Sequence, residues 1–510
     1  MLLAGLLSRS SKSKDIIYII KGKILNKMDN GKALARGLQN HSPSQRRRDF
    51  TMDISDLPAD VLIQILSELS IKEAMRASTL SSKWKNLWWF VTRSLNITLP
   101  EKIRGLQRTS SGFHGKLAIE IYWHIMWVNK VMGLHSAPYV DELSIVALLN
   151  EKVFKHVDGW IEFASKKGIQ KFELDFGYCS DNLNESYSFP SIKWFVQLRG
   201  SVDATSSRCC LRKSINEDHC SGIFCCLKSL SLKNVNISNE ILEYLMSNCR
   251  FLEQICVEKS KDLVNLKVTG CRLKHFQIIK CFNLKILEIL ADNIMSFLYI
   301  GPKIDVPFRS VPSRLKKLTI GGQYVGSFVS EPDDHRIYLS LLESLKLMIP
   351  RTVDDAISSS GFQLNRMINL KHLELHVPPT HHETLPSYLG FINKAPFLST
   401  FKMKYDVEGP LPQMIQYKRG YELCRHFQLR EVEFVGYLGG VADYHLIHRI
   451  LAAAAFLDRL VLQFEKIEFV NGVNVRRVGS MEDLWREELP FGAELVVKFN
   501  DVVLSHYRKD

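Results

Sequence analysis

The densest group of potential metal ligands in this 510-residue chain lies between residues 209 and 226. Its members are Cys209, Cys210, His219, Cys220, Cys225 and Cys226. Thiolates and imidazoles can hold a zinc ion, and structural zinc sites usually present them at regular spacings. This spacing does not form two C-x-x-C pairs, and the last two cysteines run directly into an apolar segment with strand character. We therefore expect loop and core cysteines here rather than a zinc site.

Two histidine-containing groups offer weaker metal chemistry. Asp443, His445 and His448 lie on or near one predicted helix, where histidines three residues apart could share a metal. Further ligands for such a metal are not evident in the sequence. The run His381-His382-Glu383 is not an H-E-x-x-H motif and follows Pro378-Pro379, which is typical of a surface loop. We expect no metal at either group.

Motifs for phosphate binding and for nucleophilic catalysis are missing from the sequence. Gly321-Gly322 and Gly326-Ser327 lack the lysine that would reach a phosphate. No G-x-S-x-G turn occurs, and no cysteine lies in a local pattern that suggests an activated thiolate. The sequence therefore predicts a binding protein that uses no cofactor, rather than an enzyme.

The distribution of charge and the number of cysteines further limit the possible function and cellular location of the protein. Of the net charge of +13, residues 1–52 carry +8, so the excess belongs to a basic tail and direct nucleic-acid binding is disfavoured. No apolar run approaches the roughly 18 residues that a membrane span requires. Eleven cysteines without a disulfide framework, and no clear secretory signal, indicate reduced thiols in the nucleus or cytoplasm.

The tail itself, residues 1–50, lacks sustained periodicity and is predicted to be disordered. Its Arg46-Arg47-Arg48 run could address the nucleus or touch anionic polymers. A mitochondrial leader also stays open, because the tail is basic and poor in acids. Met28 and Met52 leave open a later start of translation.

The stretch Asp53–Phe90 carries more apolar side chains than so small a piece can bury by itself. Leu57-Pro58 opens a first helix, since proline at the first helical position loses no hydrogen bond. Ser70 and Glu73 have the spacing of a capping box, which predicts a second helix. A third helix is predicted from about Leu80. Its aromatic and leucine side chains recur at i, i+3 and i+4.

This stretch resembles the F-box family in its Leu-Pro opening, its apolar first helix and its closing Ser82-Lys83-Trp84-Lys85-Asn86-Leu87-Trp88. The resemblance implies that the module docks a Skp-type adaptor, which links it to a cullin ubiquitin ligase. Which apolar residues face that adaptor and which face inward is not encoded in the pattern. On this resemblance the expected adaptor-binding residues are Leu57, Pro58, Val61, Leu62, Ile65, Leu66, Trp84, Leu87 and Trp88.

An L-x-x-L-x-L motif fills most of the remaining chain, beginning with Ile169-Phe172-Leu174 and ending with Leu457-Leu460-Leu462. Most steps between copies are 21 to 31 residues, and ten copies follow in order, which predicts leucine-rich repeats. Each repeat places one short strand on a shared face and its leucines in a common core. Because the steps are irregular, we expect an uneven arc. The other copies begin at Leu227, Leu252, Leu273, Leu315, Leu342, Leu370, Leu398 and Leu429.

Alternation and helical periodicity predict further elements around these motifs. Two strands are expected before the first motif, at Ser94–Leu99 and Val140–Ile145. Helices are expected at Phe113–Gly133 and Val153–Lys166, the second ended by Gly168. Polar insertions at Cys179–Cys220 and Glu331–Arg336 are predicted to be loops.

Near the carboxyl terminus, a strand from Leu429, a helix at Tyr444–Ala455 and a strand at Leu457–Phe464 follow one another. This order resembles the FBD domain that accompanies F-box and leucine-rich repeats in a large plant family. The predicted fold is α/β: a three-helix F-box, an irregular leucine-rich-repeat arc and an FBD-like αβ segment. The predicted domains are residues 1–50 (tail), 51–92 (F-box), 93–425 (repeats) and 426–510 (FBD-like).

The order of modules implies a non-catalytic substrate receptor of a Skp–cullin–F-box ubiquitin ligase. In that role the F-box binds the adaptor and the repeat arc binds an unidentified target protein, which leads to the target's ubiquitination. Two alternatives stay open. One is a repeat scaffold that acts without a ligase; the other is a receptor that binds a small molecule in the arc.

Overall fold

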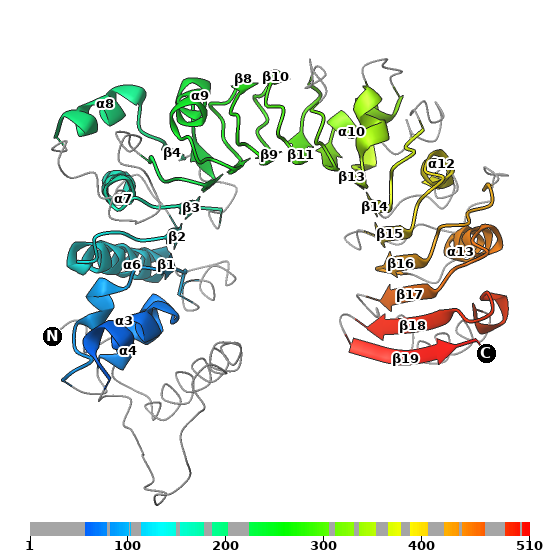
Figure 1. Cartoon of the computed structure of the whole chain (residues 1–510), viewed down its shortest axis with the longest axis horizontal. Coiled ribbons are helices and arrows are strands. Elements are labelled where there is room, and N and C mark those ends of the chain that lie inside the picture. The colour runs from blue at the N-terminus through cyan, green and yellow to red at the C-terminus, as the bar shows by residue number, and fades with distance from the viewer. Residues whose placement is uncertain are drawn as a thin grey trace, which may run out of the picture. The chain divides into compact units, whose positions relative to one another are not determined.

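The computed structural model (Figure 1) divides the chain into two compact units, each taken here by itself. Unit 1 is the chain up to Val235 with Asn248–Leu252, and unit 2 is Asn236–Ser247 with Glu253 onward. No helix within the described ranges is long and apolar enough to cross a membrane. The predicted tail, residues 1–50, lies outside the described residues. These are 57–78, 82–100, 103, 114–148, 153–177, 186–201, 224–304, 312–330, 336–352, 366–378, 388–405, 423–437, 441–464, 485–499 and 502–509.

Unit 1 begins with the helices α3 (Ala59–Ser67) and α4 (Ile71–Ala77). Pro58 is the N-cap of α3, one residue before the helical position expected for it. The predicted capping box of α4 is confirmed. The Ser70 backbone N–H donates to Glu73 Oε2 at 2.9 Å, and the Glu73 N–H donates to Ser70 Oγ at 3.4 Å.

The predicted third helix is wrong in type over its described part. Residues 82–86 form turns, and only a short 3-10 helix, η3 (Leu87–Phe90), follows. The physical reason is Asn86, whose φ of 68° lies in the left-handed region and cannot continue an α-helix. Asparagine tolerates that conformation better than most residues, because its short side chain can hydrogen-bond locally.

The sheet of unit 1 is parallel. Its strands follow the chain in the order β1 (Ser94–Ile97), β2 (Glu142–Val146), β3 (Lys171–Asp175) and β5 (Ser229–Lys233). The helices α6 (His114–Leu134) and α7 (Phe154–Lys166) separate the first three strands in sequence, as predicted. Gly168 adopts a φ of 57° just past α7, which is the conformation of a glycine C-cap.

The insertion predicted as a loop at Cys179–Cys220 contains regular structure. It holds a short strand, β4 (Tyr187–Ser188), and a helix, α8 (Ile192–Ser201). Phe195 of α8 is fully buried, and its ring lies 6.2 Å from that of Phe224. The helix thus forms because it supplies an aromatic side chain to the core. The chain passes from unit 1 to unit 2 within β6 (Val235–Asn236).

Unit 2 is a longer parallel sheet closed by one antiparallel strand, β19 (Val502–Arg508). Its helices are α9 (Asn239–Asn248), α10 (Tyr324–Ser330), η8 (Arg336–Leu341), α12 (Leu389–Lys394) and α13 (Val441–Ala453). In Figure 1, α12 and α13 lie along one side of the strands. The parallel strands, in sheet order, are β7 (Gln254–Glu258), β9 (His275–Ile279), β11 (Ser296–Gly301), β12 (Lys317–Gly322), β13 (Ser344–Met348), β14 (His372–Val377), β15 (Thr400–Tyr405), β16 (Glu431–Val435), β17 (Arg459–Phe464) and β18 (Glu494–Phe499).

The ten predicted L-x-x-L-x-L sets form the core, because all of their apolar side chains are buried. Two further strands, β8 (Asn265–Val268) and β10 (Ile286–Ile289), follow Leu263 and Leu284 between these sets and pair in a separate two-stranded parallel sheet. Within each unit, the strand of every predicted set therefore joins the main parallel sheet, and its apolar side chains join the interior of that unit.

Candidate functional site

The nine residues expected to bind an adaptor divide into two groups by burial. Four lie in the interior of unit 1, namely Leu62, Leu66, Trp84 and Trp88. Five remain at the surface: Pro58 is exposed, and Leu57, Val61, Ile65 and Leu87 are half-buried. The sequence could not separate the groups, because the buried and the half-buried apolar residues of α3 belong to one broad apolar face at helical spacing.

The apolar face of α3 is thus wider than the interior covers. Leu62 and Leu66, one turn apart, are buried. Val61 and Ile65, about 100° further round the helix, are half-buried, and the N-cap Pro58 is exposed, so these three residues form the outer side of α3. A single exposed leucine is common on protein surfaces and needs no explanation. A contiguous group of apolar residues left at the surface of a helix more often marks an interaction site. The geometry therefore supports a protein-docking surface along this side of α3.

Backbone hydrogen bonds fix the helical module to the first repeats. The Trp89 carbonyl accepts from the N–H groups of Ser136 at 2.8 Å and Ala137 at 3.1 Å, just beyond α6. The Thr92 carbonyl accepts from the Asp141 N–H at 2.8 Å, and the Ser67 hydroxyl accepts from the Thr92 N–H at 3.4 Å. The module and the start of the repeats consequently behave as one piece.

Two buried histidines lie at this junction. His135 Nε2 is 2.8 Å from the Val91 carbonyl oxygen, and His124 Nε2 is 3.3 Å from that of Val146. A neutral ring donates from Nε2 in each case, which leaves His135 Nδ1 buried without a partner. Burial therefore lowers the pKa of both imidazoles to about 4, and the nearby Lys167 charge adds to the effect at His135.

A second apolar surface of unit 1, missed in the sequence, lies on α6. Ile119, Tyr122, Trp123 and Met126 are all exposed and recur at i, i+3, i+4 and i+7. The same helix buries Ile125 and Val128 on its other side. The spacing of the four exposed residues was the available signal, but it is hidden in a helix that is apolar nearly all round.

The outward strand faces carry ordered charges in both units. In unit 1, Lys233 Nζ bridges Glu173 at 2.9 Å and Asp175 at 3.3 Å, and the Ser144 hydroxyl donates to Glu173 at 2.9 Å. Burial favours the neutral acid, but the Lys233 and Ser144 bonds outweigh it and lower the pKa of Glu173. These pairs connect side chains at neighbouring positions of paired strands.

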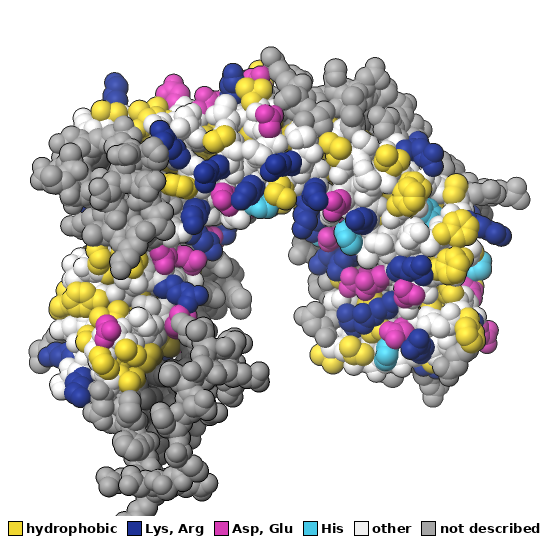
Figure 2. All heavy atoms as spheres, viewed as in Figure 1, with side chains coloured by type: hydrophobic (Ala, Val, Ile, Leu, Met, Phe, Trp, Pro, Cys, Tyr) yellow, Lys and Arg dark blue, Asp and Glu magenta, His cyan; other side chains and the backbone are white. Residues whose placement is uncertain are grey.

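In unit 2, Glu374 accepts from Lys346 at 3.1 Å and from His376 at 2.6 Å, and Lys402 pairs with Glu433 at 2.8 Å. The His376 bond, helped by Lys346, lowers the pKa of Glu374 to about 2. Figure 2 shows basic and acidic side chains interspersed over β14 to β17. Such a face favours partners with complementary polar groups and carries no large field of one sign.

The paired strands from β9 to β13 present an apolar stretch beside these charges. Ile279, Ile300, Gly321 and Met348 occupy successive positions of the register. A Cβ on Gly321 would lie 3.0 Å from Ile300 Cγ1 and 3.1 Å from Met348 Cβ, so the glycine lets the neighbouring side chains close over it. The strand face therefore offers both apolar and charged contacts to a partner.

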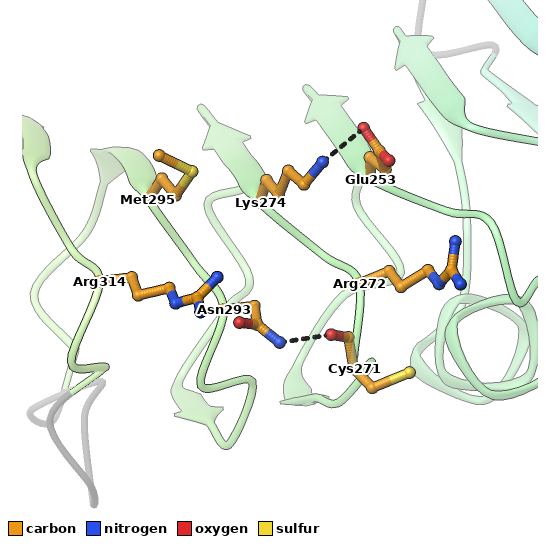
Figure 3. A pocket seen from close by; sticks show the side chains of 7 residues that line it. All are labelled: Glu253, Cys271, Arg272, Lys274, Asn293, Met295 and Arg314. Atoms are coloured by element: carbon orange, nitrogen blue, oxygen red, sulfur yellow. Dashed lines mark hydrogen bonds and ion pairs between the residues drawn. The ribbon is translucent and has the colours of Figure 1, made fainter.

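One surface pocket of about 260 Å³ lies in unit 2 beside the starts of β7, β9 and β11 (Figure 3). Lys274 Nζ is 3.1 Å from Glu253 Oε2, and Asn293 Nδ2 donates to the Cys271 carbonyl at 2.6 Å. The constant repeat step of 21 residues was the signal that could have predicted this grouping. The pocket is lined by Glu253, Cys271, Arg272, Lys274, Asn293, Met295 and Arg314.

The residues considered as metal ligands in the sequence lie partly outside and partly inside the described residues. Cys209, Cys210, His219, Cys220 and the His381-His382-Glu383 run lie outside the described residues. Cys225 and Cys226 are buried, with their sulfurs 4.0 Å apart. Within the part of the chain that the structure describes, no three His, Cys, Asp or Glu side chains gather closely enough to hold a metal ion.

Asp443, His445 and His448 do not converge. Asp443 is buried, while the exposed His448 lies 2.8 Å from Glu488, which also accepts from the Tyr444 hydroxyl at 2.7 Å. Burial and the Asp443 charge together raise the pKa of Tyr405 and Tyr437. Asp443 therefore belongs to the interior with Tyr405 and Tyr437, whereas His448 lies at the surface.

A helical module of the F-box pattern that is hydrogen-bonded to parallel repeat strands defines an F-box protein with leucine-rich repeats. The F-box domain model matches residues 54–91. The chain belongs to the leucine-rich-repeat family described as At1g61320/AtMIF1, LRR domain, whose model matches residues 131–483.

Similar proteins come from Arabidopsis thaliana. The F-box/LRR-repeat protein At3g28410 is 28% identical over 223 residues, 43% of this chain and 40% of the relative. The F-box/FBD/LRR-repeat protein At1g13570 is 26% identical over 225 residues, 44% and 48% of the two chains. The F-box/FBD/LRR-repeat protein At1g13780 is 24% identical over 441 residues, 81% and 91%. The first two matches span less than half of the relatives' length.

Proposed function

We propose that this protein is the substrate-receptor subunit of a Skp–cullin–F-box ubiquitin ligase in the nucleus or cytoplasm. The F-box surface docks a Skp-type adaptor and through it a cullin, while the repeats hold a target protein. In this role the chain positions the target protein and supplies no catalytic group. Holding a target lysine near activated ubiquitin raises its effective concentration there.

The observation that carries this proposal is the outer side of α3. Leu57, Pro58, Val61, Ile65 and Leu87 are the residues that we assign to the adaptor contact. Leu62, Leu66, Trp84 and Trp88 support that surface from the interior. We also propose that the repeats curve into an irregular arc and that residues 426–510 are an FBD-like continuation of them. The domain bounds of 51–92 and 93–425 belong to the same proposal.

The test uses paired substitutions at the outer side of α3. Val61→Asp with Ile65→Asp places two charges where the adaptor is proposed to bury apolar surface, and leaves the interior residues of α3 unchanged. Co-purification of the adaptor and the cullin should fall at least about tenfold, because an unpaired charge at an apolar interface costs more than 1.4 kcal/mol. Far-ultraviolet circular dichroism checks that the variant folds.

The matched control is Val196→Asp, which places one charge on an exposed residue of α8 in the same unit. It should retain the adaptor. Recovery of the adaptor by the Val61/Ile65 variant at the wild-type level would overturn the ligase proposal. That outcome would favour a repeat scaffold that acts without a ligase.

A further inference from the structure

Five successive repeats of unit 2 each leave one large apolar side chain exposed at an equivalent place. That place is the short turn or bend directly before the strand, and the strands concerned are β14 to β18. The five side chains are between 48% and 84% exposed. They are Ile368, Phe397, Phe427, Phe456 and Phe491, and we call them the apolar row.

The row is continuous because the strands that follow it pair residue for residue. Paired strands lie about 4.8 Å apart, so the turns before them are close neighbours. The rings of Phe427 and Phe456 lie 6.4 Å apart. Arg430 braces the second ring: its guanidinium carbon is 5.5 Å from the ring centre, and its Nη1 donates to the Phe456 carbonyl oxygen at 2.9 Å. Figure 2 shows hydrophobic side chains one after another along this side of the strands.

The interior of unit 2 is filled without these side chains. In each of two repeats the next residue along the chain, Leu398 after Phe397 and Leu457 after Phe456, is the one that enters the core. The exposed rings therefore add little to the fold. A contiguous row of exposed apolar side chains, unlike scattered single ones, marks an interaction site.

Cations accompany the row at a second repeated position. Arg366, Lys394 and Arg425 each stand six residues before the first residue of a strand, which is β14, β15 and β16 in turn. Arg366 and Arg425 are exposed, and Lys394 is half-buried. On this flank, an acidic side chain of a partner would meet a cation in each of three successive repeats. The row therefore favours a partner that carries acidic residues beside its apolar ones.

The geometry favours a helix as that partner. The strands β14 to β18 are each paired on both sides, so an extended peptide cannot join them as a further strand. A helix satisfies its own backbone groups and can dock through side chains alone. Its turns rise about 5.4 Å, close to the roughly 4.8 Å between strands, so successive turns meet successive repeats. The four steps from Ile368 to Phe491 span on the order of 20 Å, the length of about 14 helical residues.

We propose that the apolar row docks an amphipathic α-helix of the target protein, in which acidic residues flank the apolar side. Naming the partner as the target rests on the proposed function. The rings pack between apolar side chains of the helix, and Arg366, Lys394 and Arg425 pair with its acidic residues. Charged pairs at the rim of an interface select the partner and its orientation more than they add affinity.

The experiment measures retention of the full-length protein on two immobilised peptide libraries of about 15 residues. Both fix leucines at i, i+4, i+7 and i+11 and randomise the neighbouring positions among glutamate, lysine, glutamine and serine. In the second library, two central prolines prevent a helix. Retention on the helical library should be at least about tenfold higher, and the retained peptides should be enriched in glutamate over lysine. Equal retention on the two libraries, or no preference for glutamate, would overturn the proposal.

The row is tested with Phe397→Gln, Phe427→Gln and Phe456→Gln combined. The matched control is Phe282→Gln, Ile286→Gln and Leu290→Gln, which changes three exposed apolar residues of the same unit outside the row. The row variant should lose retention on the helical library, and the control should keep it. Melting temperatures near that of the wild type check that both variants fold. Equal retention by the two variants would refute the assignment.

The flanking cations are tested with Arg366→Gln, Lys394→Gln and Arg425→Gln combined. This variant should still prefer the helical library but should no longer select glutamate over lysine. The control is Lys261→Gln, Lys267→Gln and Lys285→Gln, which removes the same charge from three exposed lysines of unit 2. A glutamate preference that survives in the first variant would contradict the charge pairing proposed here.

Two further measurements separate the remaining occupants and functions. Light scattering compares the wild type with the row variant; a dimer that the substitutions dissociate would mean that a second copy covers the row, which would overturn the proposal. Adaptor co-purification should be unchanged in the row variant. Failure of helix selection with the adaptor retained rejects only this inference, whereas helix selection without any adaptor binding rejects only the ligase role.

Discussion

His135 Nε2, just beyond the end of α6, donates a hydrogen bond of 2.8 Å to the carbonyl oxygen of Val91, which follows η3. The bond joins the last residue matched by the F-box model to a residue near the start of the part matched by the repeat model. At the same junction, Lys167 Nζ donates hydrogen bonds to the carbonyl oxygens of His135 and Ala137, at 3.2 and 2.6 Å. A neutral imidazole is therefore one of several groups whose hydrogen bonds hold this junction together.

Unit 1 should lose stability as the pH falls from 6.5 to 4. The unfolded histidines bind protons near pH 6.5, whereas the folded pKa values of His124 and His135 are about 4. Stability is therefore full above pH 6.5, declines between these values and levels off below. The loss should be on the order of 1–3 kcal/mol per histidine. Urea unfolding of the full chain at pH 7.5 and pH 5 measures it.

His135→Gln keeps a donor for the Val91 carbonyl but removes the titrating ring. The variant should therefore be less sensitive to pH over the same interval, even if its stability at pH 7.5 is somewhat lower. An unchanged pH dependence would show that His135 does not titrate as described.

Glu374 should stabilise unit 2 at neutral pH. Its folded pKa of about 2 lies below the unfolded value near 4.5, so its contribution is present above pH 4.5 and is lost as the pH falls towards 2. Glu374→Gln should cost about 1 kcal/mol at pH 7, because the side chain remains 31% exposed and solvent screens the pairs. Glu431→Gln, whose ion pair with Arg459 is 3.9 Å long, should cost less.

Gly322 should not tolerate a side chain. Its φ is 75°, and an added Cβ would lie 2.5 Å from the Gly301 carbonyl oxygen on the neighbouring strand. Gly322→Ala should destabilise unit 2 by at least about 2 kcal/mol. Gly159→Ala is the control: nothing lies within 4 Å of its Cβ within α7, so the change should be neutral or stabilising. Similar melting temperatures for both variants would contradict this account.

The stacked phenylalanines of adjacent repeats should be costly to remove. The rings of Phe276 and Phe297 lie 6.0 Å apart and almost parallel, and both are fully buried. Phe297→Ala should cost about 3–5 kcal/mol, the usual price of a large cavity in a core. Phe282→Ala, at a residue that is 70% exposed, should change the stability by less than about 0.5 kcal/mol.

The repeats could be predicted from the sequence because each depends on a local pattern. Three apolar residues in L-x-x-L-x-L spacing are enough to identify the strand of a repeat. The apolar residues of all ten predicted sets are buried. Two strands were missed where that pattern is disguised. In β11 the third core residue is Tyr299, and before β18 the first position is Gly492, which has a φ of 82°.

The candidate sites were harder to predict because they depend on which side of an element the fold covers. The sequence of α3 presents one broad apolar face, so the buried Leu62 and the half-buried Ile65 could not be told apart. The pocket depends on columns of residues 21 positions apart, such as Arg272 and Arg314, that no single-repeat motif contains. The packing of neighbouring elements decides which residues of α3 stay at the surface and which residues line the pocket.

Strand pairing in unit 2 also bears on how such a chain can change over time. Successive strands are offset along the chain by 21, 27, 28, 31 or 35 residues, yet they pair residue for residue from Ser296↔Lys317 to Arg459↔Glu494. Codons gained or lost between strands therefore leave each presented side chain in its place. A single codon added within a strand would turn its apolar residues outward. Genes of this kind can vary their connecting segments freely while conserving what the strands display.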